Sequence, residues 1–558
     1  MMNFVLALHS HLPWVLHHGR WPHGSDWLCE AALDTYLPLL EALEDLEREG
    51  VPAPLTLGIT PVLAAQLAHP AFAAEMRAFL AHRIEACDVA PASLAATGDG
   101  ALVPLAAFWR ERLTRLGARF ERADGNLVTA FGALEARGRL EIMSSAATHG
   151  FLPLLGRDES IRLQLLTGRA EHRRLFGRDP AGCWLPECAF RPAGPWAPAG
   201  ARASTFRQGT DAHLTQAGFR YVFVDAHQAS AGESLGQYLD VPLGTERFDA
   251  ERHGEVLPVH TEGPAARSPL RVYRVNGKGR TALAAFVRDP DASMQVWSRR
   301  RGYPGDGTYL EFHKIRWPGG LKLWRVTDPE ADLGAKQAYD PAQARARAGD
   351  HARHFAGVLA ATRAEGRGAA VIAAPFDTEL FGHWWFEGVD FLADLFRALP
   401  STTVQPVTAG GHVTAHPPRA IVRLAEGSWG AGGDYRMWLN HETAWTWRRL
   451  WPLEDAFWAV AGSALSGEPQ RAILAQAARS LLLSQASDWQ FIISTGAAAD
   501  YAELRFNEHC EDAERLVAAL APQAPEGALE AAQRRALELR ARDDLFPDVL
   551  TAVAAALR

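Results

Sequence analysis

Lysine is scarce in this chain. Only four of its 57 basic residues are lysine, which points to a compositional bias of the source rather than to a functional choice. With 65 acidic residues the formal net charge is −8. Because a surplus of acidic residues repels phosphate groups, we expect neither nucleic acid nor an anionic membrane as a partner.

Cysteine and long apolar runs are also scarce. The five cysteines include no C-x-x-C pair, so we expect reduced thiols, no structural zinc and a cytoplasmic protein. The apolar run from Phe4 to Leu8 ends at His9 and is too short for a signal peptide. Stretches of 18 or more apolar residues, as a membrane span would need, do not occur. A G-x-G-x-x-G motif after a strand is also missing, which argues against a dinucleotide-binding sheet.

Short apolar runs alternate with helical patterns along much of the sequence. At 558 residues the chain exceeds one ordinary core, so we expect a large domain and at least one smaller one. Alternating strands and helices predict a parallel sheet, and reactive residues near most strand ends favour a β/α barrel. The predicted strands are Asn3–Leu8, Leu55–Ile59, Leu140–Ser144, Trp184–Glu187, Tyr221–Val224, Ala282–Val287 and Val371–Phe376.

Other regions depart from this alternation. Residues 70–139 have helical periodicity and predict a helical insertion, whereas the polar stretch 226–269 predicts lid loops over the barrel mouth. Residues 297–328 combine glycines with aromatic residues, a composition that favours a ligand groove over a core. We therefore predict a catalytic domain over 1–410. A mostly helical C-terminal domain over 411–558 is expected to contribute to the active-site groove.

Two acids follow predicted strands in aromatic surroundings. Asp377 comes after Phe376 and shortly before two adjacent tryptophans, and Glu187 stands between Trp184 and Phe190. A barrel would bring both acids to one face although they are far apart in sequence. A helix cap or a solvated ion pair is the commoner role of a single acid, but burial beside aromatic rings is costly without a function. Two such carboxyl groups are what cleavage of a bond between sugars requires.

Histidines follow the strands as well. His9 and His11 come after the first strand, and alternation turns both toward the barrel mouth; His149 follows another strand. One interpretation is a divalent metal site, as in barrel amidohydrolases, completed by His149, His213 or His227 and an acid. The other is hydrogen bonding to sugar hydroxyls.

Tryptophan is abundant, with 18 residues. Indole rings stack on the flat C–H faces of sugars. Trp429 and Trp438 bracket a loop that is too rich in glycine to bury both rings as core, which favours an exposed, sugar-facing role. Asp488 and Trp489 form a polar and aromatic patch within helical sequence, which predicts either a contribution to the groove or packing between domains. Trp27 and Trp297 are expected to line the groove or to pack beneath it.

Together these segments resemble glycoside hydrolase family 57, and most of all its 1,4-α-glucan branching enzymes. The matching segments cover nearly the whole chain in order: residues 9–13, 148–153, 184–190, 376–385, 426–429, 438–440 and 487–489. The resemblance implies an incomplete (β/α)7 TIM-like barrel with a helical insertion and a helical C-terminal domain. It also implies Glu187 as the nucleophile and Asp377 as the general acid/base, with no metal and no cofactor.

The resemblance further implies a retaining double displacement on α-glucans such as amylose and glycogen. Transfer to a 6-hydroxyl makes a branch, transfer to a 4-hydroxyl makes a glucanotransferase, and transfer to water makes an α-amylase. We expect a monomer or a small homo-oligomer.

Branching enzymes of this family are expected to carry a lid tyrosine after the strand Tyr221–Val224. Tyr238 is the candidate; an alternative alignment places Leu235 there, and hydrolysis would then rise relative to branching. The residues expected to bind substrate are His9, His11, His149, Trp27, Tyr238, Trp297, His383, Trp384, Trp429, Trp438, Asp488 and Trp489.

Overall fold

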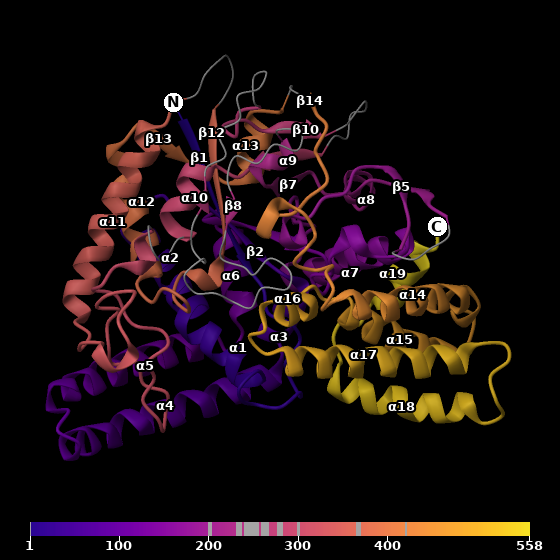
Figure 1. Ribbon diagram of the computed structural model, residues 1–558, viewed down its shortest axis with the longest axis horizontal. Coiled ribbons are helices and arrows are strands. Elements are labelled where there is room, and N and C mark those ends of the chain that lie inside the picture. The colour runs from indigo at the N-terminus through magenta and orange to yellow at the C-terminus, as the bar shows by residue number, and fades with distance from the viewer. Residues whose placement is uncertain are drawn as a thin grey trace.

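Parallel strands close into a seven-stranded barrel in the computed structural model of the protein (Figure 1). The structure describes residues 2–198, 203–229, 237–238, 256–257, 267–275, 283–297, 302–363, 370–418 and 421–558. The barrel strands are β1 (Met2–Ser10), β2 (Leu55–Ile59), β3 (Leu140–Ser145), β4 (Cys183–Trp184), β7 (Tyr221–Val224), β11 (Ala284–Val287) and β12 (Val371–Asp377).

The barrel is assembled from two sheets joined at both edges. One sheet has the order β12-β1-β2-β3-β4, and the other contains the parallel pair β11-β7. Parallel bridges between Gly182 and Tyr221 and between Arg288 and Ala373 join the sheets into a ring. The remaining strands lie outside this ring: β5 (Gly194–Trp196), β6 (Thr205–Arg207), β8 (Gln237–Tyr238), β9 (Val256–Leu257), β10 (Tyr273–Val275), β13 (Val404–Pro406) and β14 (Ile421–Val422).

Each predicted barrel strand is present, and two are shorter than expected: β11 begins only at Ala284, and β4 ends early. The sequence predicts a strand through Glu187, but β4 ends at Trp184. Pro186 has no amide hydrogen to donate to a neighbouring strand, and the chain turns there into the short helix η4 (Pro186–Cys188). The incomplete (β/α)7 barrel is therefore confirmed, with seven strands in place of the eight of a complete TIM barrel.

Alternation along the strands sorts the barrel core into two layers. In β1, Val5 and Ala7 join a cluster with inward residues of the other strands, whereas Phe4, Leu6 and Leu8 pack with the surrounding helices. Because side chains alternate in a strand, the next residues of the inward series are also turned into the barrel mouth. At the carboxyl ends these residues are His9, Asp225, Arg288 and Asp377.

Helices surround the barrel and extend beyond its carboxyl-terminal mouth (Figure 1). The described helices are α1 (Ser25–Ala31), α2 (Leu37–Arg48), α3 (Pro61–Leu67), α4 (Pro70–Ala96), α5 (Val103–Arg122), α6 (Leu127–Ala136), α7 (Asp158–Phe176), α8 (Thr210–Gln216), α9 (Ala226–Ala229), α10 (Pro290–Trp297), α11 (Pro341–Ala361), α12 (Gly388–Ala398), α13 (Ala409–Ala415), α14 (Ala444–Ala464), α15 (Gln470–Ser484), α16 (Asp488–Thr495), α17 (Ala499–Leu520), α18 (Ala528–Arg542) and α19 (Val549–Ala556). In the part of the chain that the structure describes, none of them combines the length and apolarity needed to cross a membrane.

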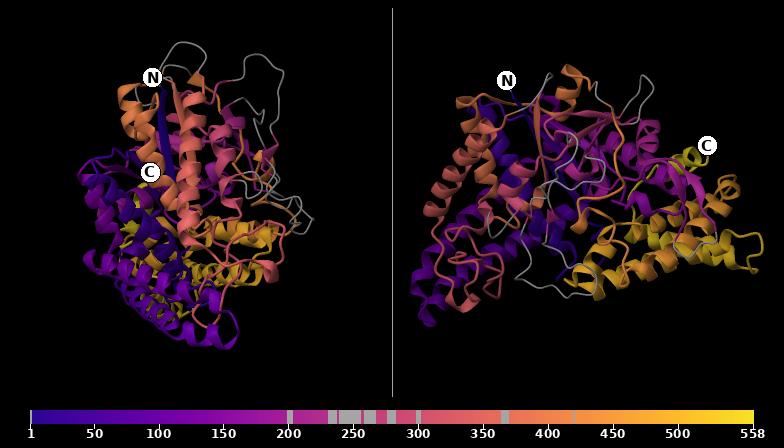
Figure 2. Two further views of the ribbon diagram at one scale, coloured as in Figure 1. Left: turned by 90° about the vertical axis from the view of Figure 1, so that its left-hand side faces the viewer. Right: turned by 45° about the horizontal axis from the view of Figure 1, so that its top comes forward.

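Two helical regions flank the barrel mouth. The insertion between β2 and β3 consists of α4, α5 and α6, and its two long helices project to one side, while α14 to α18 project to the other (Figures 1 and 2). A bridge between Gly150 and Ala486 ties the second region to the loop after β3. The domain boundary near residue 410 and the assignment of 226–269 as lid loops remain predictions; most of 226–269 lies outside the described residues.

Candidate active site

Glu187 occupies a strained turn at the end of β4. Its backbone has φ 60° and ψ 24°, in the left-handed region that costs an ordinary residue roughly 1–2 kcal/mol. The amide of Trp429 donates a 3.0 Å hydrogen bond to the Glu187 carbonyl, and the amide of Cys188 donates to Leu185. Strain of this kind persists only where the surroundings hold it, and it concentrates at functional sites.

The Glu187 carboxylate is held by three distant segments. Trp429 Nε1 donates a hydrogen bond of 2.8 Å to Oε2, and Ser487 Oγ donates one of 3.2 Å to Oε1. His149 Nδ1 lies 3.7 Å from Oε1, and the side chain remains 16% exposed. The carboxylate is therefore oriented by the protein while part of it stays open to a ligand.

Asp377 ends strand β12 on the inward side of the barrel. It lies in register with His9 of β1, so the two side chains enter the mouth from neighbouring strands. Among the described residues, none makes a hydrogen bond to the Asp377 carboxyl group. A carboxyl group without a fixed partner is free to exchange a proton with a ligand.

Both acids retain a proton more strongly than an exposed carboxyl group does. Burial raises the pKa of Glu187 to about 7, although the hydrogen bond from Trp429 opposes the shift. Burial also raises the pKa of Asp377 well above its ordinary value, and the charges of Glu379 and Glu187 reinforce this. Two hydrogen-bond donors stabilise the ionised form of Glu187, whereas no described donor stabilises that of Asp377. This asymmetry suits Glu187 as the nucleophile and Asp377 as the general acid.

Three histidines stack beside the acids. His9 lies against Trp184 with ring centroids 4.5 Å apart, and its Nε2 is 2.9 Å from Nε2 of His149. The rings of His149 and His11 stack at 4.1 Å. Burial lowers the pKa of His9 and of His149 well below the ordinary value, so both imidazoles are neutral and can donate or accept hydrogen bonds.

A second layer of contacts fixes His11. Its Nε2 lies 2.9 Å from Asp488 Oδ2, and its Nδ1 lies 3.0 Å from Thr60 Oγ1. Its backbone amide donates to Glu379, which in turn accepts a hydrogen bond from the Tyr36 hydroxyl. Tyr36 belongs to the π-helical turn η1 (Ala32–Tyr36), a local form that is frequent at functional sites.

Several of these contacts were not predicted from the sequence. Thr60 follows the predicted strand Leu55–Ile59, as other polar residues at the barrel mouth follow theirs, but its contact with His11 was not predicted. Tyr36 occurs in an ordinary helical pattern, and no local signal connects it to the catalytic segment. Glu379 was visible beside Asp377 but was given no role. Ser487 belongs to the predicted patch near Asp488, yet only the fold shows that it reaches Glu187.

Among the described residues, one group in this site has ligand atoms close enough together to hold a metal ion. Ligand atoms of His11, His149 and Asp488 lie within 4.8 Å of one another. Three protein ligands and a water molecule form the usual donor set of a catalytic zinc. The same imidazole nitrogens already have hydrogen-bond partners in Asp488, Ser487 and His9. Metal binding and hydrogen bonding to sugar hydroxyls would therefore use the same imidazole nitrogens. The absence of a metal stays a prediction.

Aromatic rings lead outward from Glu187. The indole of Trp429 packs edge-on against Trp184 at 5.3 Å and against Trp297 at 5.9 Å. Trp297, at the end of α10, is also 6.1 Å from Phe376. Trp384 is 56% exposed and lies beside His383, whose amide donates to Thr35. The structure thus brings Trp297, His383, Trp384 and Trp429 to the side of the barrel mouth that contains Asp377.

Two of the expected tryptophans lie beneath the site instead of on its surface. Trp438 is 1% exposed and stacks on Phe151 at 4.5 Å. Trp489 is 1% exposed as well, and its Nε1 donates to the carbonyl of Leu483. Both rings are enclosed by protein, so they support the site from below. For Trp489 this is the packing alternative considered above.

Trp27 and Tyr238 are the remaining predicted substrate-binding residues, and the structure gives their role less support. Trp27 is half-buried in α1, with its ring 6.0 Å from that of His23, and its contact with substrate stays a prediction. The backbone of Tyr238 forms β8, which pairs with β9 and lies next to the turn η9 (Ala431–Gly433) after Trp429. The side chain of Tyr238 and all of Leu235 lie outside the described residues.

Comparisons with known proteins show the family to which the chain belongs. The family described as glycosyl hydrolase family 57 matches residues 5–425, and the family described as 1,4-alpha-glucan branching enzyme, C-terminal, matches residues 454–553. A 1,4-alpha-glucan branching enzyme of Thermococcus kodakarensis is 37% identical over 92% of this chain and 73% of its own length. A probable 1,4-alpha-glucan branching enzyme of Mycobacterium tuberculosis is 32% identical over 97% of this chain and 96% of its own.

Two solved structures are similar to this chain over nearly their whole length. A crystal structure of the family 57 branching enzyme from Thermococcus kodakaraensis superimposes with a TM-score of 0.88 at 35% identity, covering 99% of this chain and 96% of that one. An α-amylase from Thermotoga maritima superimposes with a TM-score of 0.77 at 27% identity, covering 99% of both chains.

Proposed function

The chain belongs to glycosyl hydrolase family 57, and on this premise we propose that it is a 1,4-α-glucan branching enzyme. The observation that carries the proposal is the pair Glu187 and Asp377, held at one end of the barrel beside stacked aromatic rings. Burial raises the pKa of both carboxyl groups, and the described hydrogen-bond donors stabilise the ionised form of Glu187 but not that of Asp377, which fits Asp377 for proton donation. The resemblance of residues 454–553 to the C-terminal region of branching enzymes supports transfer as the outcome.

In the first step, the Glu187 carboxylate attacks the anomeric carbon of an α-1,4-linked glucosyl unit. The bond to the glycosidic oxygen breaks, and this oxygen takes the proton of Asp377 as the leaving chain departs. The hydrogen bonds from Trp429 and Ser487 orient the attacking oxygens. Neutral His9 and His149 supply donors and acceptors for the hydroxyl groups of the bound sugar.

In the second step, the 6-hydroxyl oxygen of an acceptor glucan attacks the same carbon. Its proton passes to Asp377, and Glu187 leaves as a carboxylate, so two inversions give retention. Asp377 regains its proton in this step, which restores the enzyme for the next cycle. Water must be kept from the intermediate for a branch to form, and we assign this task to Tyr238 and the segment around it.

Proton NMR of amylose incubated with the purified protein tests the proposal. New α-1,6 anomeric signal with few new reducing ends is the expected result. The Glu187→Gln variant should keep its fold and lose transfer completely, because an amide cannot form the glycosyl ester. Transfer that persists in this variant would rule out the assignment.

A second candidate function is hydrolysis of the same substrate. The structural likeness to the Thermotoga maritima α-amylase favours it, since the two folds agree over nearly their whole length. The same NMR experiment separates the candidates, because an α-amylase produces reducing ends without α-1,6 signal. A 4-α-glucanotransferase would instead redistribute α-1,4 chain lengths with neither change.

The proposal includes a place for the enzyme in the cell. We place it in glycogen synthesis or remodelling in the cytoplasm, acting as a monomer or a small homo-oligomer. The five cysteines are all free and buried, which suits a reducing compartment. Cell fractionation with an antibody to the protein tests the location, and light scattering coupled to size-exclusion chromatography tests the oligomeric state.

A further inference from the structure

A cavity lies beside the segment that follows Asp377, between that segment and the glycine-rich loop of residues 302–340. Its volume is about 390 Å³. Trp297 of α10 lines it on one side, Leu380 and Trp384 line it after Asp377, and Phe312 and His313 line it from the loop. Sequence composition alone favours a ligand groove in this loop, and the proposed catalytic chemistry makes no use of it.

The cavity continues the row of aromatic rings that starts at Glu187. Trp429 donates its indole N–H to Glu187 and packs against Trp297, which lines the cavity. Two further lining rings, those of Phe312 and Trp384, are in contact, with centroids 4.9 Å apart and an angle of 33° between their planes. Trp384 is 56% exposed, so one face of its indole is available to a ligand. A sugar chain leaving the catalytic site on this side would meet these rings.

The chemistry of the lining favours a neutral polyol. Glu311 and Lys336 neutralise each other at 3.0 Å, and the Lys336 ammonium also donates to the carbonyls of Val326 and Asp328. The cavity therefore offers no uncommitted ammonium group to a phosphate or a carboxylate. The lining residues next to the catalytic segment are aromatic or aliphatic: Trp297, Leu380 and Trp384.

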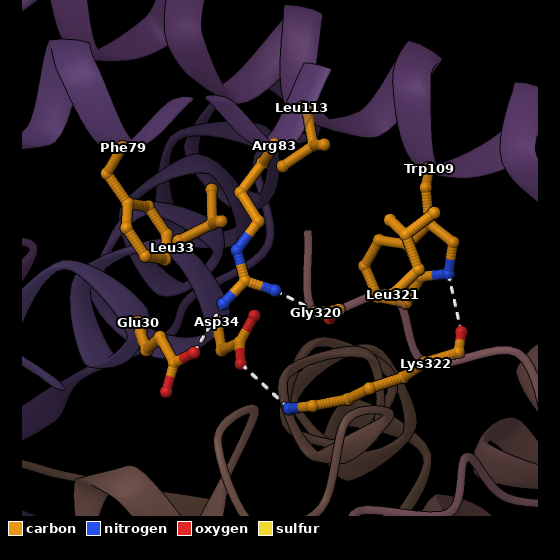
Figure 3. Close-up of a pocket in the computed structure, with 10 residues that line it drawn as sticks. All are labelled: Glu30, Leu33, Asp34, Phe79, Arg83, Trp109, Leu113, Gly320, Leu321 and Lys322. Carbon is orange, nitrogen blue, oxygen red and sulfur yellow. Dashed lines mark hydrogen bonds and ion pairs between the residues drawn. The ribbon is translucent and has the colours of Figure 1, made fainter. Parts of the chain in front are cut away.

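The loop that forms the cavity is held firmly in place. Figure 3 shows its base against the helical insertion: Trp109 Nε1 donates to the carbonyl of Lys322 at 2.6 Å, and the Lys322 ammonium lies 3.2 Å from Asp34. Arg83 of α4 donates to the carbonyl of Gly320 and pairs with Glu30. A binding surface that is ordered in advance loses less entropy when a ligand binds.

The start and the end of the loop are both attached beside α12. Glu387, the residue before that helix, accepts a 2.7 Å hydrogen bond from the Tyr339 hydroxyl and one of 3.1 Å from the Leu310 amide. The loop is thus fixed at its middle and near both ends by groups that take no part in the proposed chemistry. The helical insertion therefore supports this loop.

The position of the cavity also indicates which part of the substrate it binds. Ser487 and His149 approach Glu187 from α16 and β3, whereas the cavity adjoins the segment that follows Asp377. The general acid/base acts on the oxygen of the leaving chain and then on the acceptor hydroxyl. A chain bound on the Asp377 side is therefore the leaving chain in the first step and the acceptor in the second.

We propose that this cavity is a subsite for the acceptor α-glucan chain, with Trp384 and Phe312 as its stacking surface. The inference rests on the proposed function. It assigns to the loop of residues 302–340 the positioning of the acceptor, separate from the site that binds the transferred chain.

The first test is calorimetric titration of maltoheptaose into the inactive Glu187→Gln protein. Adding Trp384→Ala should weaken the affinity roughly tenfold, the factor that corresponds to about 1.4 kcal/mol. Trp317→Ala is the matched control, because Trp317 is 58% exposed in the same loop but packs against Trp21 outside the cavity. Phe312→Ala is the second variant, in case Trp384→Ala does not fold. Equal affinities for the Trp384 and Trp317 variants would overturn the proposal.

The second test uses the active enzyme with amylose. Trp384→Ala should lower the ratio of α-1,6 linkages to new reducing ends severalfold, because an acceptor that binds poorly loses to water. Trp317→Ala should leave this ratio unchanged. If the wild-type protein makes no α-1,6 linkage, the proposed function fails, while the titration still decides whether the cavity binds glucan. If the wild type branches and Trp384→Ala branches equally well, the subsite alone fails.

Discussion

The hydrogen bond between Trp429 and Glu187 makes the pH dependence of the enzyme predictable. Trp429 Nε1 lies 2.8 Å from Glu187 Oε2, and its N–H stabilises the ionised form of this carboxylate. The substitution Trp429→Phe removes this donor but keeps an aromatic ring against Trp184 and Trp297. A hydrogen bond to a charged group contributes about 1.5–3 kcal/mol, and one pKa unit corresponds to about 1.36 kcal/mol. Because the bond from Ser487 remains, we expect the pKa of Glu187 to rise from about 7 by roughly one unit.

The sign of the effect on activity follows from the role of Glu187. The nucleophile must be ionised, so the acidic limb of kcat/KM follows its pKa in the free enzyme. Raising this pKa moves the acidic limb to higher pH by about one unit. On that limb the variant should lose about tenfold more activity than on the plateau. The alkaline limb, which reports Asp377, should move much less.

The assay is kcat/KM on a soluble maltooligosaccharide across the pH range, with matched variants beside Trp429→Phe. Trp438→Phe is the control, because its indole nitrogen has no hydrogen-bond partner among the described residues. Ser487→Ala removes the longer, 3.2 Å bond and should shift the limb in the same direction by less. A limb that stays in place in Trp429→Phe, or that moves equally in Trp438→Phe, would refute the reasoning.

Three further predictions concern other parts of the site. Asp377→Asn should lower transfer from natural glucans by about 10²–10⁴-fold, the usual contribution of a general acid, while a glycosyl fluoride, whose leaving group needs little protonation, should react far better; equal losses on both donors would contradict the role. Tyr36→Phe leaves Glu379 without its hydroxyl donor, so the free energy of unfolding should fall by about 1–3 kcal/mol in chemical denaturation, and an unchanged midpoint would count against the network. Elemental analysis should find no stoichiometric zinc in active enzyme, and chelators should not inactivate it. Inactivation that zinc reverses would favour the metal interpretation of His11, His149 and Asp488.

Much of the barrel was predictable because its strands are buried on both faces. Runs such as Val5–Leu8 and Val371–Phe376 are apolar throughout, and the polar residue that ends each run marks the carboxyl end of the barrel. The two acids were predictable for the same reason, since each follows such a strand. Alternation also places His9 correctly, because Val5 and Ala7 share its side of β1.

The surroundings of the acids were less predictable, because they depend on contacts between distant segments. Trp429 and Trp438 have similar sequence contexts, yet the loop between them turns back so that only Trp429 reaches Glu187. Composition alone cannot distinguish a ring on the surface of such a loop from one beneath it. Tyr36 reaches Glu379 across more than 300 residues through a π-helical turn, which local sequence does not reveal.

The central claim is that Glu187 forms a glycosyl ester. Mass spectrometry of peptides after incubation with a 5-fluoroglucosyl fluoride tests it most directly, because the second fluorine slows breakdown of the intermediate. We predict that one peptide gains the mass of a single fluoroglucosyl unit, that fragmentation places this mass on Glu187, and that Glu187→Gln gains none. Labelling of another carboxylate, or turnover of the substrate with inversion and no labelled peptide, would contradict the account.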